Sequence, residues 1–175
     1  MDTKVLVTYA TKYGATAEIA ARVGQVLNEA GLSTVVQPVD NVGDVREFDA
    51  VVLGSAVYAG QWRKEAAAFL TDNEHQLAER PVWLFSSGPT GEGEPAELMK
   101  GWTFPVAQQP IADRIHPRDI VFFGGKIDKE KLNLGEKLLI KGVKAPVGDF
   151  RDWQAIEAWA AEIAETLKTR TQLLV

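Results

Sequence analysis

The stretch Val5-Leu-Val-Thr-Tyr-Ala-Thr-Lys-Tyr-Gly-Ala-Thr16 decides the fold, because an apolar strand runs directly into a turn that opens an amphipathic helix. Thr11 and Thr16 supply hydroxyl donors in this turn, and Gly14 lets the backbone approach an anion without an intervening Cβ atom. The amides at the start of the helix add the positive end of its dipole, so the pattern predicts a cradle for a phosphate monoester. The turn has neither the G-x-x-x-x-G-K-[ST] of nucleoside triphosphatases nor the G-x-G-x-x-G of dinucleotide folds, which argues against ATP and NAD.

Size and composition limit the possible functions. A chain of 175 residues with 46% hydrophobic content is long enough for one core and short for two, so we expect one domain over residues 1–175. The formal net charge of −5 argues against a nucleic-acid binder. The lack of cysteine excludes disulfides, iron–sulfur clusters and thiol catalysis, and two isolated histidines, His75 and His116, argue against a metal site. The sequence shows no signal segment and no apolar run of the roughly 20 residues that span a bilayer, so we expect a cytoplasmic protein.

Apolar, β-branched runs alternate with helical patterns along the chain. The runs are short and nearly continuous, as in parallel strands covered on both faces, and they lie at about 4–8, 34–39, 50–54, 81–86 and 120–124. The helical patterns carry apolar stripes, which are Ile19, Val23, Val26, Leu27 and Ala30, then Trp62, Ala66, Phe69 and Leu70, and finally Trp153, Ile156, Ala160, Ile163 and Leu167. This alternation predicts a three-layer α/β domain with a doubly wound, five-stranded parallel sheet in the strand order 2-1-3-4-5.

Three loops are expected to meet at one edge of this sheet. In this strand order a ligand lies outside the carboxyl ends of the first, third and fourth strands. The first of these loops is the phosphate cradle, and the other two are Gly54-Ser-Ala-Val-Tyr-Ala-Gly-Gln-Trp62 and Ser86-Ser-Gly-Pro-Thr-Gly-Glu-Gly93. Their small residues let backbone groups meet the edge of a flat heterocycle, and Tyr58 or Trp62 offers a face for stacking. The alternative is that these are ordinary tight turns and that Trp62 begins a core-facing helix.

The Thr-x-x-Gly-x-Thr spacing at residues 11–16 resembles the flavodoxin family, whose equivalent loop wraps the phosphate of FMN. Longer motifs look like the flavodoxin-domain branch that contains the menaquinone-dependent protoporphyrinogen oxidases. These motifs are Tyr9-Ala-Thr-Lys-Tyr-Gly-Ala-Thr16 followed by Ala-Glu-Ile-Ala, Gly54-Ser-Ala-Val-Tyr-Ala-Gly-Gln-Trp62, Phe85-Ser-Ser-Gly-Pro89, Phe123-Gly-Gly-Lys126 and Gly148-Asp-Phe-Arg-Asp-Trp-Gln-Ala-Ile-Glu-Ala-Trp159. The resemblance covers nearly the whole chain and implies a flavodoxin-like fold.

The resemblance also implies FMN as the cofactor, with its phosphate on the first loop and its isoalloxazine enclosed by the other two. The residues that it implies for FMN binding are Thr11, Lys12, Tyr13, Gly14, Ala15, Thr16, Ser55, Ala56, Val57, Tyr58, Ala59, Gly60, Trp62, Ser86, Ser87, Gly88, Pro89, Thr90 and Gly91. Two departures from the family stand out. Tyr13 occupies a position where many small flavodoxins have Thr, and the third loop lacks the aromatic residue that commonly stacks on the flavin. An aromatic side chain would then cover only one face of the flavin.

Two segments exceed what a minimal sheet needs. Residues 94–117 are rich in proline and aromatic residues, and they predict a short helix mixed with extended chain that would form a wall of the flavin site. The other segment, at about 126–148 after the fifth strand, holds six Lys against three acidic residues within 126–144, and this net +3 leaves −8 for the remainder. Leucines at 132, 134, 138 and 139 and Ile140 stand beside these lysines. The segment either packs on the domain with solvated lysines or forms a docking surface for a membrane, a quinone or a redox partner.

Taken together, these residues and the resemblance predict an FMN-dependent oxidoreductase that resembles the quinone-linked protoporphyrinogen oxidases. Contact with the inner face of a membrane through 126–144 is one option for its location. The flavin itself accepts hydride or single electrons, so we expect no catalytic side chain and no metal. A flavodoxin-type electron carrier without its own substrate is the alternative, and the oligomeric state stays open. A receiver-type signalling module would need acidic residues where the first and third strands end in Thr8-Tyr9 and Gly54-Ser55.

Overall fold

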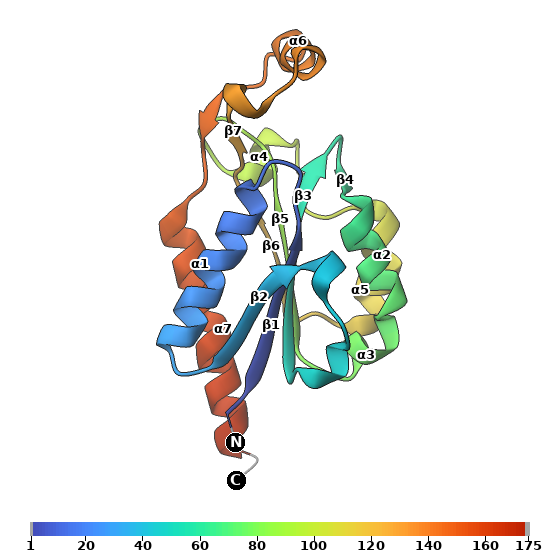
Figure 1. The fold of residues 1–175 in the computed structure, drawn as a ribbon, viewed down its shortest axis with the longest axis vertical. Helices are drawn as coiled ribbons and strands as arrows, with labels where there is room; N and C mark the ends of the chain where they lie inside the picture. The colour runs from blue at the N-terminus through green and yellow to red at the C-terminus, as the bar shows by residue number, and fades with distance from the viewer. Residues whose placement is uncertain (1, 174–175) are drawn as a thin grey trace.

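A central parallel sheet organises the computed structural model, which describes residues 2–173. Its five parallel strands are β1 (Lys4–Ala10), β2 (Ser33–Pro38), β3 (Ala50–Tyr58), β5 (Val82–Ser87) and β6 (Asp119–Phe123). They lie in the order β2-β1-β3-β5-β6 (Figure 1). This arrangement confirms the predicted α/β class and the doubly wound order. The fourth and fifth predicted strands are β5 and β6 here, because a short hairpin strand, β4 (Gln61–Trp62), follows β3.

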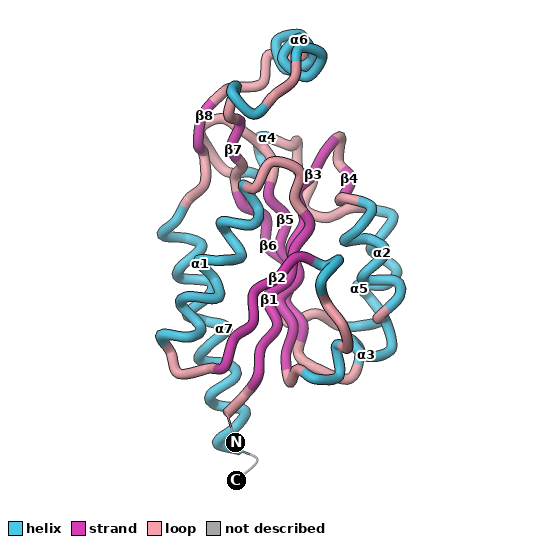
Figure 2. The backbone as a smooth tube through the Cα atoms, viewed as in Figure 1, coloured by secondary structure: helices cyan, strands magenta, loops and turns pink. Residues whose placement is uncertain are grey.

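Helices cover both faces of the sheet and make three layers (Figure 2). Those on one face are α1 (Ala15–Glu29) and α7 (Trp153–Leu173), and those on the other are α2 (Lys64–Asp72), α3 (Glu74–Ala78) and α5 (Gln109–Ile115). Successive strand side chains alternate between the two cores, so Val5 and Val7 pack with α1 and α7 whereas Leu6 packs on the opposite side. Because both faces are buried, the strands read as continuous apolar runs in the sequence.

A cluster of aromatic rings fixes α7 against the sheet. The Trp159 ring lies edge-on to Phe85 and Phe123, with centroid distances of 5.9 and 5.6 Å. Its indole N–H donates to the Asp119 carboxylate at 3.0 Å. Gly54 on β3 leaves room for the Phe85 ring, since a Cβ atom at that position would lie 2.0 Å from it. These contacts join β3, β5, β6 and α7 into one packed unit below the carboxyl edge of the sheet.

The chain between β6 and α7 forms an arm, residues 126–149, that projects beyond the carboxyl edge of the sheet (Figure 1). β7 (Lys126–Ile127) leads out, β8 (Gly148–Asp149) returns antiparallel to it, and α6 (Leu134–Gly142) lies at the tip. Asn133 and Glu136 form a capping box at the start of α6. At the base of the arm, buried Arg151 pairs with Asp149 at 2.7 Å and with Glu18 of α1 at 2.5 Å. The base of the arm is therefore anchored to the domain.

The structure corrects the expected start of the second helix. Trp62 lies in β4 (Gln61–Trp62), which pairs antiparallel with the end of β3, and α2 begins only at Lys64. The turn between β3 and β4 is Ala59-Gly60, with φ angles of 49° and 71°. Two consecutive positive φ angles indicate a type I′ hairpin turn. A positive φ at Ala59 is rare for a residue with a side chain, so the hairpin could not be predicted from the residue types at this turn.

Residues 94–117 contain more helix than the sequence suggested. They form α4 (Pro95–Leu98) and α5, with a 3-10 turn at Val106–Gln108 between them. Pro95 and Pro110 stand in the first turns of the two helices, where the missing N–H removes no intrahelical hydrogen bond. Among residues 2–173, no helix is both long enough and apolar enough to cross a bilayer.

Candidate functional site

The loops after β1, β3 and β5 meet at the carboxyl edge of the sheet and line one cavity of about 670 Å³. This is the edge where the doubly wound order places a ligand. The predicted site residues that line the cavity are Thr11, Lys12, Tyr13, Ala15 and Thr16 from the first loop, Ala56, Val57, Tyr58 and Ala59 from the second, and Ser87, Gly88, Pro89 and Thr90 from the third. Segments far apart in the sequence therefore share one site.

The first loop has the geometry of an anion cradle. Gly14 is the N-cap residue of α1 with a φ of 93°, and its own N–H donates to Thr11 Oγ1 at 3.0 Å. Its lack of a side chain means that it cannot cap α1, so the first amides of the helix are left for an external acceptor. A Cβ atom at Gly14 would meet nothing within 4 Å, so the backbone angle rather than the space selects glycine here.

Thr16 and Ser87 join the first loop to the third. Their hydroxyl oxygens lie 2.8 Å apart, and both side chains are buried. One hydroxyl hydrogen forms this bond, which leaves the other available to an acceptor in the cavity. The donors at this end of the cavity are thus hydroxyls and helix amides, with the Lys12 ammonium beside them. Such a set suits the oxygens of a phosphate monoester, which accept hydrogen bonds.

Tyrosines from two loops present rings to the cavity. Tyr58 ends β3 next to the hairpin turn and is 44% exposed, and Tyr13 reaches the cavity from the first loop. Partial burial is the main cause that raises the pKa of Tyr58 above its usual value of 10.0. Burial and the nearby Glu136 carboxylate likewise raise the pKa of Tyr13. Both phenols are therefore neutral at pH 7, as aromatic groups that cover a flat ligand should be.

Six of the predicted site residues do not line the cavity, and they are Gly14, Ser55, Gly60, Trp62, Ser86 and Gly91. Trp62 is 6% exposed, packs edge-on against Phe104 with ring centroids 5.2 Å apart, and donates its indole N–H to Ser86 Oγ at 2.8 Å. The Ser55 hydroxyl accepts the backbone N–H of Arg63 at 3.0 Å. These side chains hold the loops from beneath, and Tyr58 rather than Trp62 offers a ring to the cavity.

The arm and α4 supply a further wall of the cavity, which sequence reasoning foresaw only for residues 94–117. The apolar lining from these segments is Leu98, Met99, Ile127, Leu132, Leu139, Ile140, Val143, Ala145 and Pro146. Leu138 and Leu139 are exposed, which contradicts the alternative that this run packs on the domain. The mixture of leucines and lysines at 126–144 was the sequence feature that marked this segment as unusual. The sequence did not reveal that the arm folds back beside the first loop.

Two polar contacts tie the arm to the first loop. Lys12 Nζ lies 2.6 Å from Glu136 Oε1, and Lys131 Nζ donates to the Tyr13 carbonyl at 3.2 Å. The hydrogen bond from Lys12, followed by those from Tyr13 and from the Asn133 amide, lowers the pKa of Glu136 from 4.5 to about 2. Glu136 in turn raises the pKa of Lys12. Both groups are therefore charged at neutral pH, and the contact persists there.

A model of the flavodoxin domain matches residues 6–153 of the chain. The chain belongs to the flavodoxin domain family. Its fold is similar to that of a flavodoxin from the domain Archaea, at 14% identity and a TM-score of 0.64 over 95% of this chain and 99% of that one. Oxidised flavodoxin 2 from Bacillus cereus is similar at 19% identity and a TM-score of 0.57, over 94% of this chain and 99% of that one.

A larger protein contains a similar unit. Rubredoxin oxygen:oxidoreductase from Desulfovibrio gigas matches at 14% identity and a TM-score of 0.63, over 96% of this chain. The match covers only 37% of the oxidoreductase, so the shared part is a fraction of that protein. Identities this low show a common fold. A comparison with curated proteins gives no match.

FMN is the cofactor of this flavodoxin-domain protein. The residues present fit FMN, since an uncapped helix start with hydroxyl donors lies at one end of the cavity and two neutral tyrosines are among its lining residues. The chain is thus a flavin-binding electron-transfer protein, and a flavodoxin domain passes its electrons to redox partners.

Proposed function

We propose that the protein is an FMN-dependent oxidoreductase that resembles the quinone-linked protoporphyrinogen oxidases. The observation that carries the proposal is the arm, because it adds an apolar wall to the flavin cavity. An electron carrier needs an accessible flavin edge for a partner protein, whereas an enzyme that oxidises an organic molecule needs a chamber beside the flavin. A cavity of about 670 Å³, lined by three loops, α4 and the arm, supports the second role.

In the proposed complex each loop has a separate task. The first loop holds the FMN phosphate through the hydroxyls of Thr11 and Thr16 and the backbone amides of residues 12, 13, 15 and 16, while the Gly14 N–H holds Thr11 in place. The second and third loops enclose the isoalloxazine, with Tyr58 against one face and the backbone of residues 87–90 at its edge. Proposed site residues that lie beneath the loops, such as Trp62 and Ser86, act by fixing the course of the backbone.

Bound FMN supplies the hydride and single-electron chemistry, so the chain's own residues position the substrate and exclude water. Leu139, Ile140 and Val143 line the cavity from the arm, so a bound substrate would cover them and exclude water from the flavin. In each turnover the substrate gives up a hydride and a proton, and the quinone takes up the same electrons and protons to become a quinol. No side chain has to donate or accept a proton for this balance.

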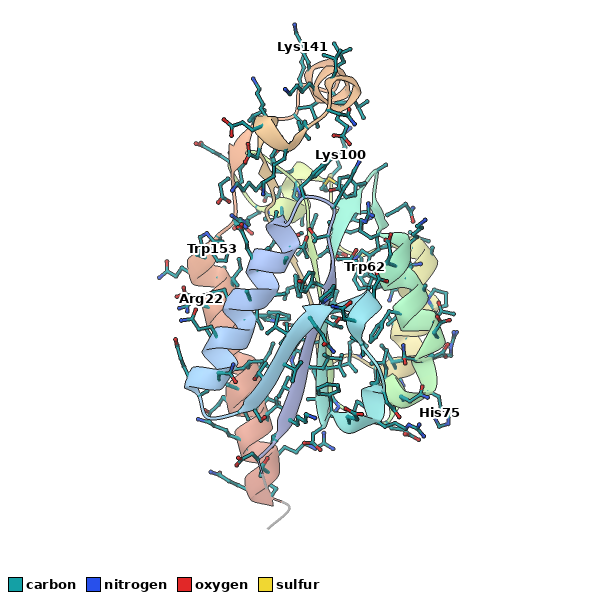
Figure 3. All side chains as sticks on the ribbon, in the orientation of Figure 1. Arg22, Trp62, His75, Lys100, Lys141 and Trp153 are labelled. Carbon is teal, nitrogen blue, oxygen red and sulfur yellow. The ribbon has the colours of Figure 1, made fainter. Side chains whose placement is uncertain are left out.

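We also propose that the outer face of α6 contacts a membrane surface, where the quinone is dissolved. Leu134 and Leu138 lie one helical turn apart, are 76% and 63% exposed, and do not line the cavity. Lys141 extends from the same helix at the tip of the molecule (Figure 3). Exposed leucines beside lysines are typical of interfacial helices. The net charge of +3 on residues 126–144 would attract anionic lipid, whereas the net charge of −8 on the rest of the chain would repel it.

Anaerobic oxidation of protoporphyrinogen tests the proposed function. With a menaquinone analogue, the FMN-loaded protein should form fluorescent protoporphyrin well above the rate without protein. Quinol should appear in the proportion that the electron balance requires. A rate equal to that of the protein-free mixture would overturn the substrate assignment.

A flavodoxin-type electron carrier is the second candidate. The similarity to two flavodoxins over nearly their whole length favours it. A carrier would exchange electrons rapidly with a flavodoxin reductase and would not turn over porphyrinogen. Stopped-flow reduction and the anaerobic assay on the same preparation distinguish the two functions.

A further inference from the structure

We propose that the arm and the flavin loops form a binding site for an amphipathic organic anion, in which Lys126 and Lys144 bind the acidic groups. The inference rests on the proposed function and deepens it, because it names the class of molecule that the cavity beside the flavin takes. Both lysines belong to the lining of the cavity. Neither belongs to the three loops assigned to FMN.

The apolar half of the site lies on the arm and α4. Leu139 and Ile140 of α6 and Val143, the C-cap residue of this helix, lie on one side of it by their spacing, and all three line the cavity. Leu98 and Met99 line it from the α4 segment. A ligand with an apolar body could therefore remove its own surface and that of these side chains from water at the same time.

The charged half of the site consists of cations without partners. Four lysines line the cavity, but Lys12 pairs with Glu136 and Lys131 donates to the Tyr13 carbonyl. Within residues 2–173, neither Lys126 nor Lys144 has a carboxylate within 4.0 Å or a side-chain hydrogen bond. Their ammonium groups are therefore free to pair with an external anion.

The carboxylates of the same cavity are already engaged. Glu18 pairs with Arg151, and Glu136 pairs with Lys12. Asp128 accepts the backbone N–H of Glu130 at 3.1 Å. This backbone hydrogen bond leaves the Asp128 charge in place, but the three ammonium groups of Lys126, Lys131 and Lys144 outnumber it. The net unpaired charge at the cavity is therefore positive. This charge beside an apolar wall is complementary to a molecule with an apolar body and acidic groups at its edge.

Two matched probes test the inference on the FMN-loaded protein. 1-Anilinonaphthalene-8-sulfonate has an aromatic body with one acidic group, and N-phenyl-1-naphthylamine is its uncharged counterpart. Equilibrium dialysis measures the affinity of each without interference from flavin absorbance. Lys126→Gln and Lys144→Gln remove the charges and keep most of the side-chain length. Lys129→Gln is the matched control, since Lys129 is an exposed residue of the same arm that does not line the cavity.

Each cavity variant should weaken binding of the sulfonate roughly threefold, and the double variant about tenfold. Binding of the neutral probe should stay within about twofold in every variant. Lys126→Arg and Lys144→Arg should restore binding of the sulfonate, because the charge returns. Unchanged binding of the sulfonate in the double variant, or an equal loss in Lys129→Gln, would overturn the inference.

Two further measurements separate this inference from the proposed function. The FMN dissociation constant should be the same in all variants, and a parallel loss of FMN would assign the lysines to the flavin and overturn the anion site. If the sulfonate binds in a lysine-dependent way but porphyrinogen is not oxidised, the anion site stands and the proposed function fails. If porphyrinogen is oxidised with an unchanged KM in the double variant, the function stands and the anion site fails.

Discussion

Gly14 is the residue on which the phosphate cradle depends most directly, because its φ of 93° sets the turn into α1. Gly14→Ala should lower the free energy of unfolding by about 1 kcal/mol through backbone strain, and should weaken FMN binding about tenfold through the displaced amides. Urea unfolding and FMN titration measure the two effects. Gly43→Ala is the control, since a Cβ atom there also meets nothing within 4 Å and its φ is not positive. Equal behaviour of the two variants would contradict the geometry.

The Lys12–Glu136 pair predicts a specific pH dependence. The folded-state pKa of Glu136, about 2, lies below its ordinary value of 4.5, so the contact contributes fully above pH 4.5 and is lost as the pH falls toward 2. The carboxyl carbon of Glu136, followed by NMR, should therefore titrate near pH 2. Lys12→Met should move this midpoint up toward 4.5, and Lys129→Met should leave it in place. If the titration midpoint of Glu136 is the same with and without Lys12, the pair does not form in solution.

Trp62 shows where residue-level prediction stops. Its place in a stripe with Ala66 and Phe69 correctly indicated a buried side chain, since all three are buried. The stripe did not reveal that Trp62 belongs to a hairpin. The hairpin turn depends on a positive φ at Ala59, and an alanine in the sequence does not predict a positive φ. The burial of Trp62 followed from the helical spacing of apolar residues, whereas the choice of Tyr58 as the ring at the cavity followed only from the path of the backbone.

At the level of elements, the outer face of α6 should bind anionic membranes. Vesicles of phosphatidylglycerol should bind the FMN-loaded protein in a flotation assay, and phosphatidylcholine vesicles should bind it much less. Leu134→Gln and Leu138→Gln should each weaken binding about tenfold, because each removes a side chain from the acyl boundary. Val106→Asn is the control, as Val106 is 82% exposed but lies outside the arm. Binding that depends equally on Val106, or that ignores lipid charge, would contradict this surface.

The elements of the sheet were predictable and the position of the arm in space was not, for a physical reason. A strand that is buried on both faces appears in the sequence as a continuous apolar run. Five such runs therefore predicted the α/β fold class, and the handedness of the crossovers predicted the strand order. The position of α6 depends on contacts such as Lys12 with Glu136, which are 124 residues apart. The local spacing of apolar and polar residues does not predict a contact between residues so far apart in the sequence. The loops of the cavity and the wall from residues 94–117 were therefore predicted, and the wall from the arm was not.

For the whole molecule, the structure separates a flavin-binding body from an arm that can be removed. Lys126 pairs with Asp149 in the β7–β8 ladder, so a two-residue Asn-Gly turn could replace residues 127–148 and close a tight hairpin. The exchange keeps the Asp149–Arg151 pair at the base and all three loops of the cradle. This shortened protein should keep its FMN dissociation constant within about threefold, because the FMN contacts that we propose lie outside the arm.

The central claim is that the arm makes a flavodoxin domain into an enzyme. The most direct test compares the rate of anaerobic protoporphyrinogen oxidation by the full FMN-loaded protein with the rate of the shortened one. We predict turnover by the full protein and a loss of at least about a hundredfold in kcat/KM without the arm, since the substrate then lacks a wall to hold it beside the flavin. Equal rates for the two FMN-loaded proteins would contradict the claim.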